Sequence, residues 1–192
     1  MIEQIGLDEA KAKFLDFPVN IRSAMVKSIN NVAPVAHTLG VDRINGKVAL
    51  PKTYIKNRLY ISQRATNTDP MAVISGRVRP TQLQRYSGTQ LFSPAKLPGK
   101  KRLDGVSVRV KQGGGTKRIA HGWVMKLKAG SSDDSIGSNL GIATRTGKGK
   151  KDFRIRYGAS VDQVFRAVKD EIRPEVEQLL ADEWRKQMRD GL

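Results

Sequence analysis

The sequence contains no cysteine among its 192 residues. This absence excludes disulfide bonds, thiolate metal sites and thiol catalysis. Histidine is also scarce: only His37 and His121 are present, and no residues near either one in the sequence would complete a catalytic triad or a metal cluster. With so few ligand types available, we expect no metal ion, no cofactor and no enzymatic activity.

Long hydrophobic runs are missing as well. No run approaches the roughly 18 apolar residues that indicate a membrane-spanning helix. Residues 1–4 lack the basic and then apolar pattern of a signal peptide. We therefore expect a protein that is made and kept in a cytoplasm and has no membrane partner. Aromatic residues make up only 6% of the chain and hydrophobic residues 39%, which predicts a modest and mostly aliphatic core.

Acidic residues are outnumbered by basic ones, 18 to 35, so the formal net charge is +17. Residues 43–160 hold 25 of the basic residues and five of the acidic ones, whereas both flanking segments are slightly acidic. A surface of this kind attracts phosphate groups or acidic protein faces. The alternative is that the basic loops are only solvated. The candidate contact residues form three clusters: Lys100, Lys101 and Arg102; Lys117 and Arg118; and Lys148, Lys150 and Lys151.

No module that reads nucleic-acid sequence is recognisable in this basic segment. Residues 113–117 (Gly-Gly-Gly-Thr-Lys) superficially resemble a phosphate-binding loop, but the residue order is wrong and a strand is expected to follow. If nucleic acid is a partner, we expect contact with its backbone and no sequence readout.

Three segments have the apolar spacing of amphipathic helices. The first covers residues 7–17. The second begins near Pro18 and continues to about residue 44, with Pro34 expected to kink or interrupt it. The third covers residues 161–188, with Ser160 as the expected N-cap and Pro174 as an expected kink or division. Its stripe and those of the first two helices supply the expected core residues: Phe14, Met25, Ile29, Val164, Phe165, Val168 and Leu179.

The middle of the chain is typical of short strands. A short basic helix is expected after Pro51, with a strand as the alternative. Strand patterns follow at 72–76, 106–110, 119–128, 140–144 and 153–157, and we interpret residues 105–128 as a β-hairpin. The segments 87–104 and 129–152 are expected to be mobile loops. The sequence therefore predicts a single α+β domain over residues 1–192, in which a small antiparallel β-sheet packs against the N-terminal helices and a long C-terminal helix.

Three stretches, in this order and spacing, carry a family resemblance. The first combines Gly6 and Leu7 with Ala24 and the run Ser-Ile-Asn-Asn-Val-Ala at 28–33. The second is the run at 72–86, Ala-Val-Ile-Ser-Gly-Arg-Val-Arg-Pro-Thr-Gln-Leu-Gln-Arg-Tyr. The third is the run at 154–165, Arg-Ile-Arg-Tyr-Gly-Ala-Ser-Val-Asp-Gln-Val-Phe. Together they resemble the phage minor tail protein Z family over nearly the whole chain. Ala159 stands where that family often has proline, which should only loosen the turn between strand and helix.

The resemblance implies a non-enzymatic structural protein of a phage or prophage. It implies action in tail completion at the end of the tail that joins the head, and an influence on how the DNA end is placed. The implied partners are other tail proteins, such as the tail tube or the terminator ring, with this chain forming a ring, expected to be a hexamer. The implied locations are the host cytoplasm during assembly and the virion tail. DNA is a further candidate partner. The alternative function is that of a sequence-nonspecific nucleic-acid-binding protein.

Overall fold

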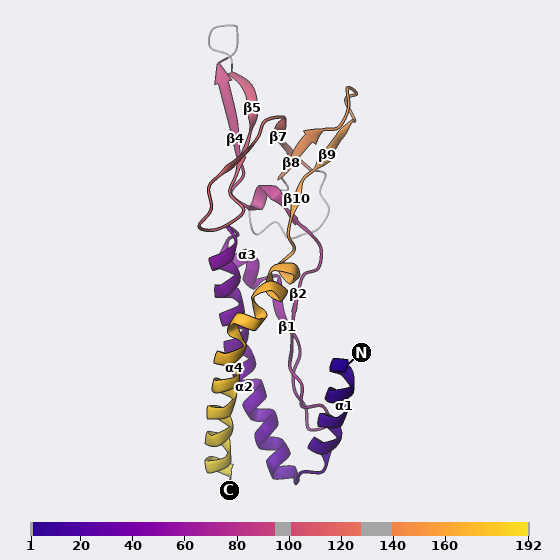
Figure 1. Ribbon diagram of the computed structural model, residues 1–192, viewed down its shortest axis with the longest axis vertical. Coiled ribbons are helices and arrows are strands. Elements are labelled where there is room, and N and C mark those ends of the chain that lie inside the picture. The colour runs from indigo at the N-terminus through magenta and orange to yellow at the C-terminus, as the bar shows by residue number, and fades with distance from the viewer. Residues whose placement is uncertain (1, 95–100, 128–139, 192) are drawn as a thin grey trace.

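The computed structural model of the protein describes residues 2–94, 101–127 and 140–191. The molecule is elongated, with helices gathered in one half and most strands in the other (Figure 1). Both ends of the chain lie in the helical half, because the first and the last elements are helices.

Four helices form in the described residues: α1 (Ile2–Leu15), α2 (Val19–Lys47), α3 (Lys52–Lys56) and α4 (Val161–Gly191). The long helices α2 and α4 pack against each other. Each contains its proline, Pro34 or Pro174, without being divided. A kink or a break is predicted at each proline, and the break does not occur. Packing along α2 and α4 supports both helices through these positions, since most helical stability in proteins comes from tertiary contacts.

The start of α4 is fixed by the residue predicted to cap it. The Gln163 backbone N–H donates to Ser160 Oγ (3.0 Å), and the Ser160 N–H donates to Gln163 Oε1 (2.9 Å). This reciprocal pair is a capping box, which satisfies two backbone donors that the helix itself cannot. The strand-to-helix junction at residue 160 is therefore encoded locally.

Short antiparallel strands build the rest of the described chain, together with one 3₁₀ turn, η1 (Leu83–Arg85). Four sheets are formed: β1 (Leu59–Gln63) with β2 (Val73–Gly76); β3 (Thr81–Gln82) with β10 (Tyr157–Gly158); β4 (Thr89–Pro94), β5 (Lys101–Val108) and β6 (Lys117–Ile119); and β7 (Gly122–Lys126), β8 (Leu140–Arg145) and β9 (Phe153–Ile155).

The predicted α+β class is confirmed, but its sheet is divided into several small ones. The segment 87–104, expected to be a loop, contains β4 and the first part of β5. The predicted hairpin at 105–128 forms only where β5 pairs with β6. The chain then turns at residues 120–121, and β7 pairs with β8. Strand pairing here overrides a local composition typical of loops, because β-structure depends on cross-strand neighbours more than on intrinsic preference. The basic segment after Pro51 forms the expected short helix and then β1.

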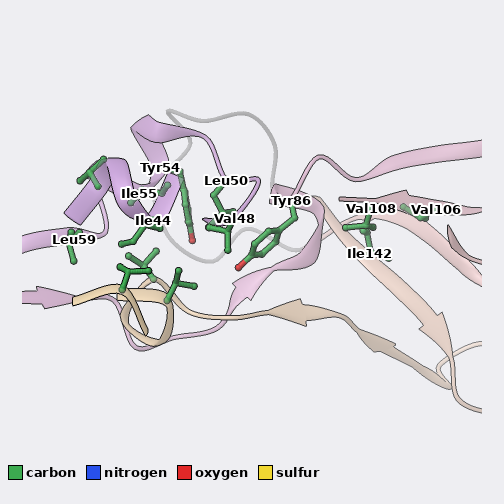
Figure 2. Packing of buried hydrophobic residues seen from close by; sticks show 14 residues of the cluster. Ile44, Val48, Leu50, Tyr54, Ile55, Leu59, Tyr86, Val106, Val108 and Ile142 are labelled. Carbon is green, nitrogen blue, oxygen red and sulfur yellow. The ribbon is translucent and has the colours of Figure 1, made fainter. Parts of the chain in front are cut away.

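The core lies at the junction between the helical half and the strand half (Figure 2). Side chains from α2, α3, the strands and α4 meet there, among them Ile44, Ile55, Tyr86, Ile142 and Val168. Contacts between residues far apart in the sequence therefore join the two halves of the molecule.

The predicted core residues divide into two groups. Phe14, Val164 and Val168 are buried, as expected. The others are only partly buried: Met25, Ile29, Phe165 and Leu179. Two of these, Met25 and Ile29, line an open groove between α2 and α4.

Candidate nucleic-acid and partner interface

Two projections extend from the strand half, away from the helices (Figure 1). The first, here called the β4–β5 arm, comprises residues 91–94 and 101–104. Its register places Phe92 opposite Leu103, Ser93 opposite Arg102 and Pro94 opposite Lys101. β6 pairs with β5 only at residues 106–108. The arm is therefore a two-stranded ribbon, with no third strand paired to it in the described part of the chain.

The base of the arm is anchored by Gln90. Its side-chain amide donates to the carbonyls of Gly105 (2.7 Å) and Leu91 (3.1 Å), and its Oε1 accepts from the Val124 N–H (2.8 Å). One side chain thus joins β4 to β7 and links the two three-stranded sheets. Gly105 has φ +91°, and a Cβ there would lie 2.4 Å from the Ile119 carbonyl oxygen, so only glycine fits this approach.

The second projection is the turn between β8 and β9, residues 146–152. Asp152 organises it: one carboxylate oxygen accepts from the Gly149 N–H (2.8 Å), and its backbone carbonyl accepts from Thr146 (3.0 Å). Arg145 Nη1 donates to the Gly149 carbonyl (2.8 Å). A Cβ on Gly147 would lie 2.6 Å from the Asp152 carboxylate. The glycines of this basic stretch therefore serve a hydrogen-bonded turn.

An aromatic contact holds this turn to the sheet. The Arg145 guanidinium lies 5.1 Å from the centre of the Trp123 ring, and the Trp123 and Phe153 rings meet edge to face at 6.0 Å. Cation–π and edge-to-face contacts are favourable at these separations. Sequence reasoning missed the role of Arg145, and the only local signal was a cation at the end of a strand pattern.

The predicted contact residues fall into three positions. Lys101 and Arg102 are exposed in the arm, and Lys148, Lys150 and Lys151 are exposed in the β8–β9 turn. Lys117 and Arg118 lie in β6, beside the part of β5 nearer the core. Lys100 lies outside the described residues. The structure therefore places five of the eight on the two projections.

Few acidic groups oppose these cations. In the described residues between 89 and 158, the acidic side chains are Asp104 and Asp152. Asp104 forms an ion pair with Arg118, and Asp152 is engaged in its own turn. No acidic partner is recorded for the cations at 101, 102, 148, 150 and 151 in this part of the structure. Both projections therefore present net positive charge.

Potential metal ligands are scattered over the described residues. These residues contain no group of three or more metal-ligating side chains. His37 Nε2 lies 2.8 Å from the Leu59 carbonyl oxygen, which is a structural contact, and His121 is exposed. Among these residues, no helix is both long and apolar enough to cross a membrane.

The helical half carries an apolar groove of about 330 Å³ that sequence reasoning did not identify. It lies between α2 and α4 and is lined by Met25, Ser28, Ile29, Glu177, Leu180, Ala181 and Trp184. The sequence does contain a signal for this groove, because the apolar stripe on α4 extends well beyond the buried Ile172. We name this feature the α2–α4 groove.

Comparison with known proteins gives one positive finding. The family model of prophage minor tail protein Z matches residues 6–192. Searches of curated proteins and of solved structures return no match. Because the family model covers nearly the entire chain, from α1 to the end of α4, this protein belongs to the prophage minor tail protein Z family.

Proposed function

We propose that this minor tail protein completes the tail at its head-proximal end, and that its strand half contacts DNA at that site. Membership of the minor tail protein Z family, over residues 6–192, is the observation that carries the proposal. That membership makes the chain a structural protein of the phage tail. The head-proximal position is what the resemblance to this family implies.

The elongated shape supports an assembly role. One half presents two basic projections, and the other presents long helices with an uncovered apolar groove. A protein built in this way has surfaces for more than one partner. We propose that several copies form a ring, with six as the expected number, and that the ring contacts the tail tube or the terminator ring. Assembly takes place in the host cytoplasm.

The charge distribution supports contact with DNA. Lys101 and Arg102 on the arm, and Lys148, Lys150 and Lys151 on the turn, are exposed on the side of the molecule that faces away from the helices. Lysine and arginine side chains neutralise phosphates and release condensed counterions. The sequence contains no recognisable module that reads nucleic-acid sequence, so we expect binding that depends on salt and not on sequence.

The tail role is tested by labelling. A lysogen that carries an epitope-tagged copy is induced, and released particles are examined by electron microscopy with a gold-labelled antibody. We expect gold at the junction of tail and head. Deletion of the gene should leave heads and tails that fail to join, and the tagged copy should restore joined particles. Gold at the distal tip, or normal joining without the gene, would overturn the proposal.

The DNA contact is tested by titrating duplex DNA at low and moderate salt. One variant replaces Lys148, Lys150 and Lys151 with glutamine, and a second also replaces Lys100, Lys101 and Arg102. Each contacted phosphate contributes about 0.9 to the slope of log affinity against log salt. Neutralising the three turn lysines should therefore flatten that slope by up to about three such increments.

A matched control separates local contact from net charge. Lys13, Lys27 and Lys169 are exposed on the helices, and replacing them with glutamine changes the net charge by the same amount as the turn variant. We expect this control to bind nearly as tightly as the wild type. If the sixfold variant and the wild type have equal affinities at both salts, the projections are simply solvated.

The second candidate function is sequence-nonspecific nucleic-acid binding outside the tail. The two basic projections are the observation that favours it. It predicts that the protein purified from induced cells carries nucleic acid and is absent from particles. Gold labelling of the tail together with weak DNA binding would exclude it.

A further inference from the structure

The β4–β5 arm exposes apolar side chains that DNA contact does not explain. Phe92 and Leu103 face each other across the two strands and are 57% and 55% exposed. Lys101 lies on the same face of the ribbon, two residues from Leu103, whereas Arg102 lies on the opposite face. A phosphate backbone would use the cations and leave the aromatic ring and the leucine in water. The combination of an apolar pair with adjacent positive charge fits a protein surface that is apolar and acidic.

The arm also has little stability of its own. A two-stranded ribbon is marginally stable in water, and its unpaired edges are available to another chain. Beyond the bulge between Gln90 and Phe92, the ribbon projects away from the body of the protein. Covering Phe92 and Leu103 would remove apolar surface from water and stabilise the arm.

The α2–α4 groove has the complementary properties. Leu180, Trp184 and Ile29 give it apolar walls, and Glu177 places a carboxylate in its lining. No ion pair to Glu177 is recorded in the described residues. Glu183, one turn and a half further along α4, is already engaged: Asn31 Nδ2 donates to it at 2.8 Å, which lowers the pKa of its carboxyl. Glu177 is thus the groove carboxylate available to an incoming cation.

Arm and groove lie in opposite halves of the same molecule (Figure 1). A single copy with this structure therefore does not bring them together. We propose that the β4–β5 arm of one copy seats in the α2–α4 groove of a second copy, with Phe92 and Leu103 against the apolar walls and Lys101 beside Glu177. Such a contact is heterologous, and repeating it closes a ring when the rotation between copies permits. The inference rests on the proposed assembly of several copies and identifies the surfaces that join them.

Single-cysteine variants test the contact directly, because the natural chain has no cysteine. Leu103→Cys in one preparation and Leu180→Cys in another, carrying tags of different size, are mixed over a concentration series and oxidised. We expect a cross-linked dimer containing both tags, more abundant than either same-tag dimer. A Phe17→Cys preparation mixed with Leu180→Cys is the control, since Phe17 is an exposed apolar residue at the corner between α1 and α2. Absence of the mixed product, or more product from the control, overturns the proposal.

A charge exchange tests the predicted polarity of the contact. Glu177→Arg or Lys101→Glu should each weaken self-association by about tenfold or more, measured by sedimentation equilibrium or on assembled tails. Combining both substitutions in one chain should recover most of the loss. Folding defects in the single-site variants would not be repaired by the second change. Losses that persist in the combined variant therefore overturn the proposed pairing.

The outcomes also separate this contact from the proposed function. Gold labelling at the head–tail junction without an arm-to-groove cross-link would retain the tail role and reject the contact. Cross-linking together with label at the distal tip would retain the contact and reject the position in the tail.

Discussion

Replacing Tyr86 with phenylalanine removes one hydroxyl group from the centre of the core. The Tyr86 side chain is 0% exposed, and its hydroxyl donates to the Ala159 carbonyl at 2.7 Å. Its ring is so close to Gly158 that a Cβ there would lie 2.6 Å from Tyr86 Cε2. This contact fixes the short strand that leads into α4 to the turn at η1, and so connects the strand half to the helical half.

The cost of Tyr86→Phe follows from the carbonyl that it leaves behind. The phenylalanine ring keeps the apolar packing, but the Ala159 carbonyl loses a hydrogen bond that is partly buried. A typical intramolecular hydrogen bond contributes a net of about 0.5–1.5 kcal/mol. We therefore expect the free energy of unfolding, from urea denaturation at neutral pH, to fall by that amount.

The same variant changes how stability depends on pH. Burial raises the pKa of Tyr86 from 10.0 to about 12, because an ionised phenolate is poorly solvated in the core. A pKa that is higher in the folded state contributes stability that is fully present below pH 10 and is lost as pH rises through about 12. The wild type should therefore lose stability over this range more steeply than Tyr86→Phe.

The assay is a series of urea unfolding curves for both proteins from neutral pH to about pH 11.5. We expect the difference in unfolding free energy to be largest below pH 10 and to shrink above it. Equal stability at neutral pH would show that the Ala159 carbonyl finds another donor. A difference that stays constant across the alkaline range would refute the assignment of Tyr86 as a buried, protonated donor.

Three further substitutions test local structure. Ser160→Ala should lower the free energy of unfolding by about 1 kcal/mol through loss of the α4 capping box, as measured by thermal or urea unfolding; no change would reject the cap. Gly40→Leu should lower the free energy of unfolding by about 1–3 kcal/mol, because even a Cβ there would lie 3.0 Å from the Phe165 ring. Adding Phe165→Ala to the same chain should recover part of that loss. If the losses from the two substitutions simply add, the contact between these positions is rejected. Gly149→Val should displace the Asp152 carboxylate and speed exchange of the turn amides by about tenfold, whereas unchanged protection would show that the turn tolerates a side chain.

The helices show how much of the secondary structure can be predicted from local sequence. The stripe on α4 and the Ser160 cap predicted that element almost to the residue, because helical contacts and caps involve neighbours within four positions. Of the two outcomes predicted at Pro34 and Pro174, a kink or a break, the break does not occur. Whether a helix continues through a proline depends on packing supplied from elsewhere, and here α2 and α4 support each other.

The strands illustrate the opposite case. Residues 89–94 have a composition typical of loops, yet they form β4 because β5 supplies the hydrogen-bonding partner. Likewise, residues 119–128 contain one continuous alternating pattern but contribute to two sheets. A strand is stabilised by partners distant in sequence, so alternation alone indicates that a strand forms without indicating which strand it pairs with.

The sequence by itself determined the charge, the absence of thiol chemistry, the α+β class and the family, because composition, periodicity and motif order can be read without knowing any distant contact. Only the tertiary structure decided that two of the basic clusters sit on separate projections, that Arg118 is paired with Asp104, and that an apolar groove with Glu177 in its lining opens between α2 and α4. Each of these depends on residues brought together across long stretches of chain. These surfaces are therefore products of packing, and the sequence supplies only the side chains from which they are made.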